Sequence, residues 1–381
     1  MEVLDVDATL GGRFPCAAGE SAEQIRLAEP RELAGQTLRQ VVRLAGGGRQ
    51  LRVRLTNRYS DRELIIGAAA VAHRKAGYEI VPETAAEVRF VGSGRVRVPA
   101  FGEVVSDPID LPVAAGTHLV LSLYLPEPTG PAAFAHMPVD TAWIVPGDQV
   151  TAQELSDAEE STSRFFLTGV DVLTEDAPPV LVAFGDSWFE GVGSSHGENR
   201  RSVDRFNERL HRGWAVNQGI GGNRLLTDQI GEHGLSRFAR DVLSVPGVAA
   251  VWANFGINDL ILDERTATAA DMIAGYTELA GLAHEAGLPI YINTIGPFGG
   301  AYYPGLNVAE GIPVRRELND WLRGTDVFDA VFDVAAAVED PARPNFIRPE
   351  FDNDGMHLND AGHRAIAAAF DLSVLPAAFG K

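Results

Sequence analysis

The sequence of 381 residues predicts two domains: an all-β sandwich over residues 1–174 and an α/β domain with a parallel, doubly wound sheet over residues 175–381. Three observations carry this prediction. Apolar residues alternate with period two in the first half, and a polar segment ending in two prolines follows it. The second half then alternates continuous apolar runs with helical patterns.

The first half reads as short strands between turn signals from Leu38 to Val172. Leu51, Val53 and Leu55 are separated by arginines, so one face of this run is apolar and the other is charged. Residues 118–126 repeat the alternation. Many short strands with glycine and proline between them favour a β-sandwich.

The second half has a different pattern after the segment 174–179, which we expect to be a linker. Val180–Gly185 is a continuous apolar run, as in a strand that is buried on both faces. Similar runs occupy residues 249–256 and 288–296, with a helical pattern over 266–287 between them. Alternating strands and helices predict a parallel sheet whose ligands bind at the carboxyl ends of the strands.

The composition excludes several classes of partner. The formal net charge is −20, which argues against nucleic acid and anionic membrane surfaces as partners. No apolar stretch approaches the roughly 18 residues of a membrane span. The chain has one cysteine, Cys16, and no signal-peptide pattern, so we expect a cytoplasmic protein without an intrachain disulfide.

Four short segments of the second half place glycines or polar residues at strand ends or just before a helix. They are Gly185–Gly191, Asn217–Asn223, Phe255–Leu260 and Asp352–Ile366. Each is weak alone, because Gly-Asp-Ser also occurs in ordinary turns where Asp or Ser caps a helix.

Together, the segments supply the parts that acyl transfer needs. Ser187 follows a buried strand, and a serine hydroxyl becomes a good nucleophile only when an imidazole such as His357 takes its proton. Asp354, three residues before His357, can fix the imidazole tautomer. The N–H groups of Ser187 and Gly222 and the side-chain amide of Asn258 can form an oxyanion hole, each donor being worth ~3 kcal/mol.

Alternatives exist for the last segment. Asp352 has a spacing that also allows it to orient His357 in place of Asp354. A metal site of Asp352, Asp354, His357 and His363 lacks a His-x-x-x-His pair or a cysteine cluster, so we expect no metal. His363 falls on the following helical pattern and is predicted to face solvent.

The four segments, in this order, resemble the SGNH hydrolase superfamily of GDSL lipases and esterases. The resemblance covers the second half and implies a flavodoxin-like parallel sheet with helices on both faces. It implies Ser187 as nucleophile, Asp354 and His357 as its triad partners, and Gly222 and Asn258 in the oxyanion hole. The first half looks like the accessory domain of some bacterial members, which are usually secreted.

One departure from the family pattern follows the nucleophile, where Trp188 and Phe189 replace the usual leucine or isoleucine. The favoured interpretation is that both rings pack under the next helix. The functional interpretation is a substrate pocket for a flat or aromatic acyl group.

The expected function is acyl transfer through an acyl-enzyme on Ser187. We expect an intracellular O-acyltransferase that moves an aromatic acyl group from an acyl-coenzyme A thioester to a hydroxyl of a natural product. This layout is similar to GDSL-family acyltransferases of antibiotic biosynthesis, including salicylyl transfer in a tetracycline pathway. The alternatives are a carboxylic ester hydrolase and a catalytically dead carbohydrate-binding protein.

No bound cofactor is expected, and the partners are a small acyl donor and a hydroxyl acceptor. The sequence does not fix the oligomeric state.

Overall fold

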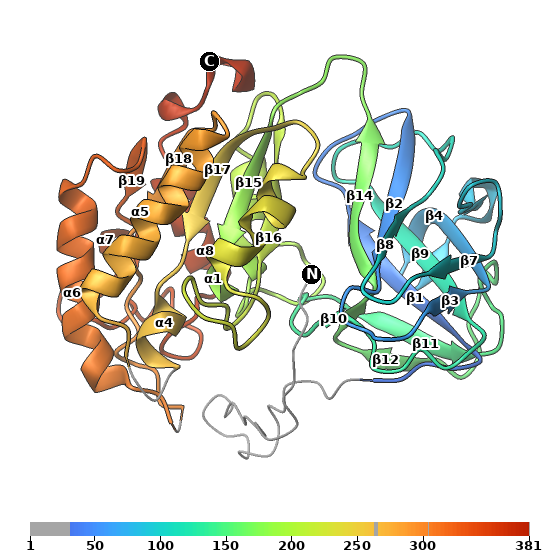
Figure 1. Ribbon diagram of the computed structural model, residues 1–381, viewed down its shortest axis with the longest axis horizontal. Helices are drawn as coiled ribbons and strands as arrows, with labels where there is room; N and C mark the ends of the chain where they lie inside the picture. Colours follow the sequence, from blue (N-terminus) through green and yellow to red (C-terminus); the bar gives the residue numbers. More distant parts are fainter. Residues whose placement is uncertain (1–30, 263–265, 304, 381) are drawn as a thin grey trace. The chain divides into compact units, whose positions relative to one another are not determined.

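The computed structural model divides the chain into two compact units at Ala177–Pro178, inside the segment expected to be a linker (Figure 1). The structure describes residues 31–262, 266–303 and 305–380. Each unit is considered by itself.

The first unit is built of antiparallel strands, as the alternating pattern predicts. Its larger sheet has the order β12-β11-β1-β9-β4-β5, with β6 beside β4, and a second sheet has the order β14-β2-β8. Two short pairs, β10-β13 and β3-β7, complete it. The strands and one 3₁₀ turn are β1 (Gln36–Arg43), β2 (Gln50–Thr56), β3 (Leu64–Ile66), β4 (Ala68–Ala76), β5 (Glu79–Ile80), η1 (Pro82–Thr84), β6 (Ala86–Glu87), β7 (Val96–Val98), β8 (Glu103–Val105), β9 (His118–Leu125), β10 (Phe134–Ala135), β11 (Ala142–Pro146), β12 (Glu159–Ser161), β13 (Arg164–Phe165) and β14 (Leu167–Leu173).

The period-two pattern of β2 is confirmed by its burial. Leu51, Val53 and Leu55 are buried, whereas Arg52 between them is exposed. Arg54, on the same face as Arg52, forms an ion pair with a carboxylate of the neighbouring strand β14. One face of this sheet therefore supplies apolar surface to the core of the unit, and the other carries charge.

The second unit contains a five-stranded parallel sheet with the order β16-β15-β17-β18-β19. The strands are β15 (Val180–Gly185), β16 (Trp214–Gly219), β17 (Val248–Asn254), β18 (Ile290–Asn293) and β19 (Ala330–Phe332). The strand order reverses at β15, whose neighbours are the next two strands of the chain. At such a reversal, loops leave on both sides of one strand and open a crevice at its carboxyl end.

The helices of this unit form two contacting groups. α2 and α7 contact α8, whereas α3 and α6 contact α5, and Figure 1 draws α5 in front of the strands and α8 behind them. The helices are α1 (Ser187–Glu190), α2 (Ser202–Asn207), α3 (Gly234–Phe238), the π-helix η2 (Ala239–Leu243), α4 (Ile257–Ile261), α5 (Ala269–Glu285), α6 (Val308–Gly324), α7 (Val334–Val338), α8 (Asp360–Ala369), and the 3₁₀ turns η3 (Leu372–Val374) and η4 (Ala377–Phe379). No described helix is both long and apolar enough to cross a membrane.

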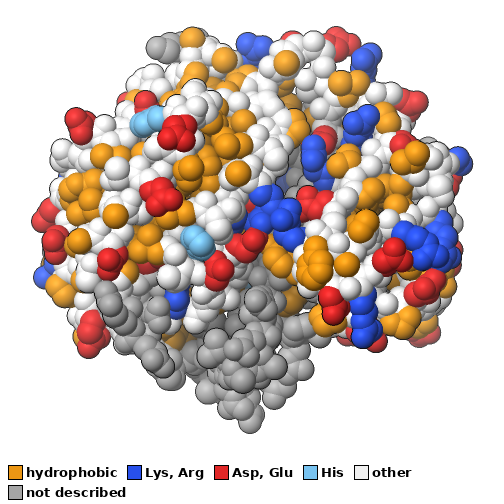
Figure 2. All heavy atoms as spheres, viewed as in Figure 1, with side chains coloured by type: hydrophobic (Ala, Val, Ile, Leu, Met, Phe, Trp, Pro, Cys, Tyr) orange, Lys and Arg blue, Asp and Glu red, His pale blue; other side chains and the backbone are white. Residues whose placement is uncertain are grey.

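The acidic side chains do not gather in one area of the face shown in Figure 2. They are scattered there among apolar, basic and uncharged groups. On this face, therefore, the acidic side chains form no continuous patch.

Candidate active site

Ser187 is the first residue of α1, directly after the carboxyl end of β15. The Asp186 side chain caps this short helix by accepting a hydrogen bond from the N–H of Trp188 at 3.0 Å. The turn needs glycine at Gly185, because a Cβ there would lie 2.5 Å from the carbonyl oxygen of Asn254. The strand and the cap thus hold the Ser187 hydroxyl at the edge of the sheet.

The structure brings Ser187, His357 and Asp354 into one hydrogen-bonded row. The distance from His357 Nε2 to Ser187 Oγ is 3.0 Å, and that from His357 Nδ1 to Asp354 Oδ2 is 2.7 Å. Asp354 Oδ1 also accepts the N–H of His357 at 2.7 Å. With Nδ1–H donating to the carboxylate, Nε2 is left to accept the serine proton.

The electrostatics of the row suit a general base. Burial lowers the pKa of His357, but the neighbouring Asp354 carboxylate outweighs it, with Asp186 and Glu190 adding in the same direction, so the pKa is raised overall. Burial raises the pKa of Asp354, yet its charge and hydrogen bonds with His357 hold that pKa well below its usual range. Asp354 therefore remains ionised and stabilises the imidazolium that forms when Ser187 reacts.

Asp352, the alternative orienting carboxylate, has another partner. Its Oδ1 accepts the N–H of Gly355 at 2.7 Å and so braces the turn before His357. Asp354, rather than Asp352, contacts the imidazole.

The prediction that His363 faces solvent is wrong. Its side chain is fully buried, with Nδ1 2.8 Å from Ser202 Oγ and Nε2 3.1 Å from the carbonyl oxygen of Val192. Burial lowers the pKa of His363 to about 4, so this ring is neutral and fastens α8 to the segment after α1. Its position on an amphipathic helix could not reveal that its face is the buried one.

Trp188 and Phe189 do not line an open pocket, which corrects the functional interpretation of this pair. Their exposed fractions are 1% and 0%. Phe189 packs against Trp252 with ring centres 4.6 Å apart. Trp188 Nε1 donates to the carbonyl oxygen of Met356 at 2.9 Å, and Met356 directly precedes His357. The indole therefore anchors the loop that carries the base.

Tyr303 is a residue of the site that the sequence did not reveal. Its hydroxyl donates to Asp354 Oδ2 at 2.6 Å, the same oxygen that His357 Nδ1 contacts. Tyr303 is buried and lies in the loop between β18 and α6, outside all four motifs. The Tyr303 hydroxyl and the His357 ring therefore both bond the Asp354 carboxylate, and the tyrosine fixes the orientation of Asp354.

Tyr303→Phe is expected to shift the pH dependence of kcat/KM. In the wild type, kcat/KM rises with pH as His357 loses its proton, with a midpoint above the ordinary imidazole pKa of about 6.5. Without the phenol, the Asp354 charge acts on His357 alone, the imidazolium becomes more stable, and the midpoint moves to higher pH. A pH–rate profile of both proteins measures this shift. An unchanged midpoint, or one that moves to lower pH, would mean that Tyr303 only packs.

The predicted oxyanion-hole residues follow three adjacent strands. Ser187 N–H lies in the first turn of α1, where N–H groups have no acceptor inside the helix. Gly222 follows β16 with φ +76°, and a Cβ there would lie 2.3 Å from Ile230 Cδ1, so only glycine fits. Asn258, in α4 after β17, donates one amide hydrogen to the carbonyl oxygen of Asn223 at 2.9 Å. Its second amide hydrogen can serve an oxyanion.

Asn258→Ala is expected to lower kcat by roughly 10²–10³-fold with little change in KM, because the lost donor acts on the charge that develops in the transition state. Steady-state kinetics on a simple ester measure this effect. Asn207→Ala is the matched control, since Asn207 uses its amide to bond Ala215 near the opposite end of β16. Equal effects of the two substitutions would contradict the assignment.

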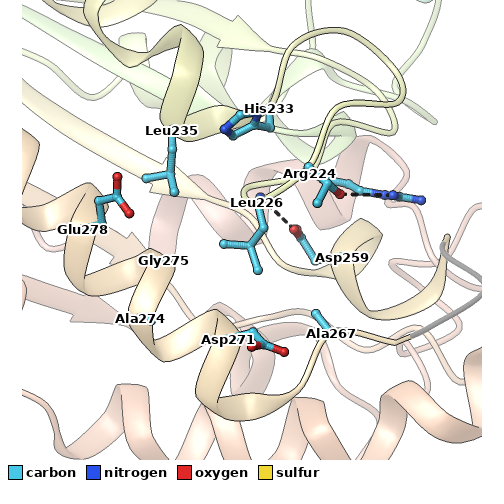
Figure 3. Close-up of a pocket in the computed structure, with 11 residues that line it drawn as sticks. Arg224, Leu226, His233, Leu235, Asp259, Ala267, Asp271, Ala274, Gly275 and Glu278 are labelled. Atoms are coloured by element: carbon cyan, nitrogen blue, oxygen red, sulfur yellow. Dashed lines mark hydrogen bonds between the residues drawn. The ribbon is translucent and has the colours of Figure 1, made fainter.

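A pocket of about 640 Å³ lies beside these loops (Figure 3). Arg224 and Leu226 line one side and α5 lines the other, with Asp259 at the base. The Asp259 carboxylate accepts the N–H groups of Leu225 and Leu226 at 3.0 Å, which ties the loop after Gly222 to α4. The residues that line the pocket include neither the triad nor the three oxyanion-hole residues. The pocket therefore lies next to the oxyanion-hole loops and is separate from the catalytic residues.

Among the described residues, no group of three or more His, Cys, Asp or Glu side chains is placed to hold a metal ion. The four residues considered for a metal site have other partners. His363 contacts Ser202, and Asp352 contacts a backbone N–H.

One comparison with known proteins gives a family match within the second unit. Residues 183–365 match the model of the GDSL-like Lipase/Acylhydrolase family, a range that contains all the predicted catalytic and oxyanion-hole residues. A search of curated proteins finds no match.

The similar solved structures include three that are named as esterases. A putative arylesterase from Agrobacterium tumefaciens is 21% identical with a TM-score of 0.39, over 50% of this chain and 95% of its own. The aryl esterase of M. smegmatis is 17% identical with a TM-score of 0.42, over 50% and 95%. A carbohydrate acetylesterase family member from Sinorhizobium meliloti is 19% identical with a TM-score of 0.39, over 50% and 94%.

Proposed function

We propose that this GDSL-type serine enzyme hydrolyses carboxylic esters through an acyl-enzyme on Ser187. The observation that carries the proposal is the row of hydrogen bonds from Ser187 Oγ through His357 to Asp354. A buried serine with a correctly oriented imidazole and an ionised carboxylate behind it is the arrangement that activates a hydroxyl for attack on a carbonyl.

The reaction has two halves. Ser187 Oγ attacks the ester carbonyl carbon while its proton passes to His357 Nε2, and the carbonyl oxygen takes the negative charge. The N–H groups of Ser187 and Gly222 and the amide of Asn258 stabilise that oxyanion. Collapse of this intermediate breaks the bond to the alcohol, which takes the proton from His357. Water then repeats the sequence on the acyl-enzyme, releases the acid and restores Ser187.

Acyl transfer is the other fate of the same acyl-enzyme. A hydroxyl acceptor in place of water would make the protein an O-acyltransferase, with acyl-coenzyme A as the expected donor. The expectation of an aromatic acyl group relied in part on Trp188 and Phe189, and both rings are buried in the core. Hydrolysis of simple esters therefore has the stronger support. An acceptor from antibiotic biosynthesis has no observation in its favour.

Ester turnover tests the proposal. The wild type is mixed with short p-nitrophenyl esters, first in water and then with added alcohols, and the free acid and the new ester are both quantified. Production of acid without an acceptor supports the hydrolase. Turnover only when an alcohol is present, with the new ester as the product, would replace hydrolysis with acyl transfer. A protein that binds sugars and turns over no ester in either condition would be the dead binding protein.

A further inference from the structure

Arg237 is a buried cation at the end of α3, outside every motif of the sequence. Its side chain is fully buried, and its guanidinium carbon lies 4.2 Å from the ring centre of Phe184 and 5.7 Å from that of Phe255. The Asp241 carboxylate, 3.1 Å from Nη1, compensates the charge. Such a group is costly to bury unless its donors are used, so its partners indicate what it holds.

The guanidinium donates to the carboxyl ends of two central strands. Nη2 donates to the carbonyl oxygen of Gly185 at 2.8 Å, two residues before Ser187. Nη1 donates to the carbonyl oxygen of Gln218 at 3.0 Å, near the end of β16. The nucleophile strand and the strand leading to Gly222 are thus held by one planar group.

The third donor extends the connection to Asn258. Arg237 Nε donates to Asn223 Oδ1 at 3.1 Å, and Asn223 directly follows Gly222. The backbone carbonyl of Asn223 in turn accepts the side-chain amide of Asn258 at 2.9 Å. The Asn223 amide nitrogen also binds the carbonyl oxygens of Ile230 and Glu232, both at 2.9 Å, so this side chain cannot turn freely.

We propose that Arg237 is a positioning residue for the oxyanion hole: its guanidinium sets the relative placement of Ser187 N–H, Gly222 N–H and the Asn258 amide. The inference rests on the proposed acyl-enzyme function. Only arginine offers a rigid fork whose N–H groups reach three oxygens in different directions, whereas lysine is a flexible point charge. Donors aimed at a developing charge lose their effect when they are displaced by about 1 Å.

The test compares Arg237→Ala and Arg237→Lys with Arg315→Ala. Arg315 is also a buried cation of the same unit, and it donates to the carbonyl oxygen of Ile295 and pairs with Glu339, neither of which is an oxyanion-hole residue. For Arg237→Ala, we expect kcat to fall by about 10²-fold while KM changes little. Guanidinium at non-denaturing concentration should restore part of kcat by filling the vacated space. Arg237→Lys should fall between wild type and Arg237→Ala. Arg315→Ala should lose stability but keep kcat per folded molecule.

Each outcome has a defined meaning. Wild-type kcat in both Arg237 variants, or equal losses in the Arg237 and Arg315 variants, would overturn the inference. If Arg237→Ala does not fold, Arg237→Lys alone tests the inference: its kcat should be lower than that of the wild type while its KM changes little. Ser187→Ala is measured in the same assay. Turnover that does not depend on Ser187 would remove the proposed function itself, whereas Ser187-dependent turnover unaffected at Arg237 would remove only this inference.

Discussion

Ser187→Ala is expected to lower kcat for ester hydrolysis by about 10⁶-fold, because it removes the hydroxyl that lies 3.0 Å from His357 Nε2. The oxyanion donors and substrate binding should leave a small residual rate above that of water. The substitution removes one hydroxyl from a buried site and no backbone contact, so the fold should persist. Kinetics on a p-nitrophenyl ester, with circular dichroism to verify folding, measure the effect.

The chain offers a close control for this substitution. Ser202 Oγ lies 2.8 Å from His363 Nδ1, so it forms a second buried serine–histidine pair in the same unit. Burial lowers the pKa of His363 to about 4, and its other ring nitrogen contacts the carbonyl oxygen of Val192 and not a carboxylate, so this pair should not support catalysis. Ser202→Ala should keep kcat within a few-fold of wild type. A large loss in Ser202→Ala together with full activity of Ser187→Ala would show that Ser202, and not Ser187, is the nucleophile.

Asp354→Asn is expected to lower kcat by about 10⁴-fold. The amide that replaces the carboxylate can donate to Nδ1, which favours the tautomer with its proton on Nε2 and blocks proton transfer from Ser187. Loss of the negative charge should also lower the pKa of His357, since Asp354 contributes most to raising it. The pH dependence of the residual kcat/KM reports this second effect.

Asp352→Asn is the matched control for that prediction. Asp352 lies two residues from Asp354 and bonds only backbone N–H groups of the same turn, so its loss should cost stability more than activity. A 10⁴-fold loss in Asp352→Asn with a nearly active Asp354→Asn would show that the other carboxylate orients the base.

The sequence was sufficient for the parts of the site that obey local rules. Ser187 and Asn258 follow buried apolar strands, and parallel strands end at the same edge of a sheet, so their proximity follows from the pattern. Asp354 and His357 are three residues apart in one turn, so their contact is also local. The continuous apolar runs also predict the strands β15 and β17 close to their observed bounds.

Features that depend on tertiary packing could not be predicted in this way. The four-residue helix α1 turns Trp188 and Phe189 inward, and nothing in their spacing distinguishes a core ring from a pocket wall. His363 lies on the buried face of α8 for the same reason. Tyr303 and Arg237 reach the site from a loop and a helix that no motif marks, and their roles come from hydrogen bonds across 51 and 52 residues of the chain.

Intact-mass spectrometry can detect the acyl group that Ser187 is proposed to carry. Three proteins are compared: the wild type, Ser187→Ala and Ser202→Ala. Each is mixed with simple esters and with acyl- and aroyl-coenzyme A thioesters and quenched rapidly in acid, and its intact mass is then measured. We expect an adduct of one acyl group on the wild type and on Ser202→Ala. Peptide sequencing should map this adduct to Ser187, and it should decay in water. Adduct formation on Ser187→Ala, or ester turnover by the wild type with no adduct at Ser187 at any quench time, would contradict it.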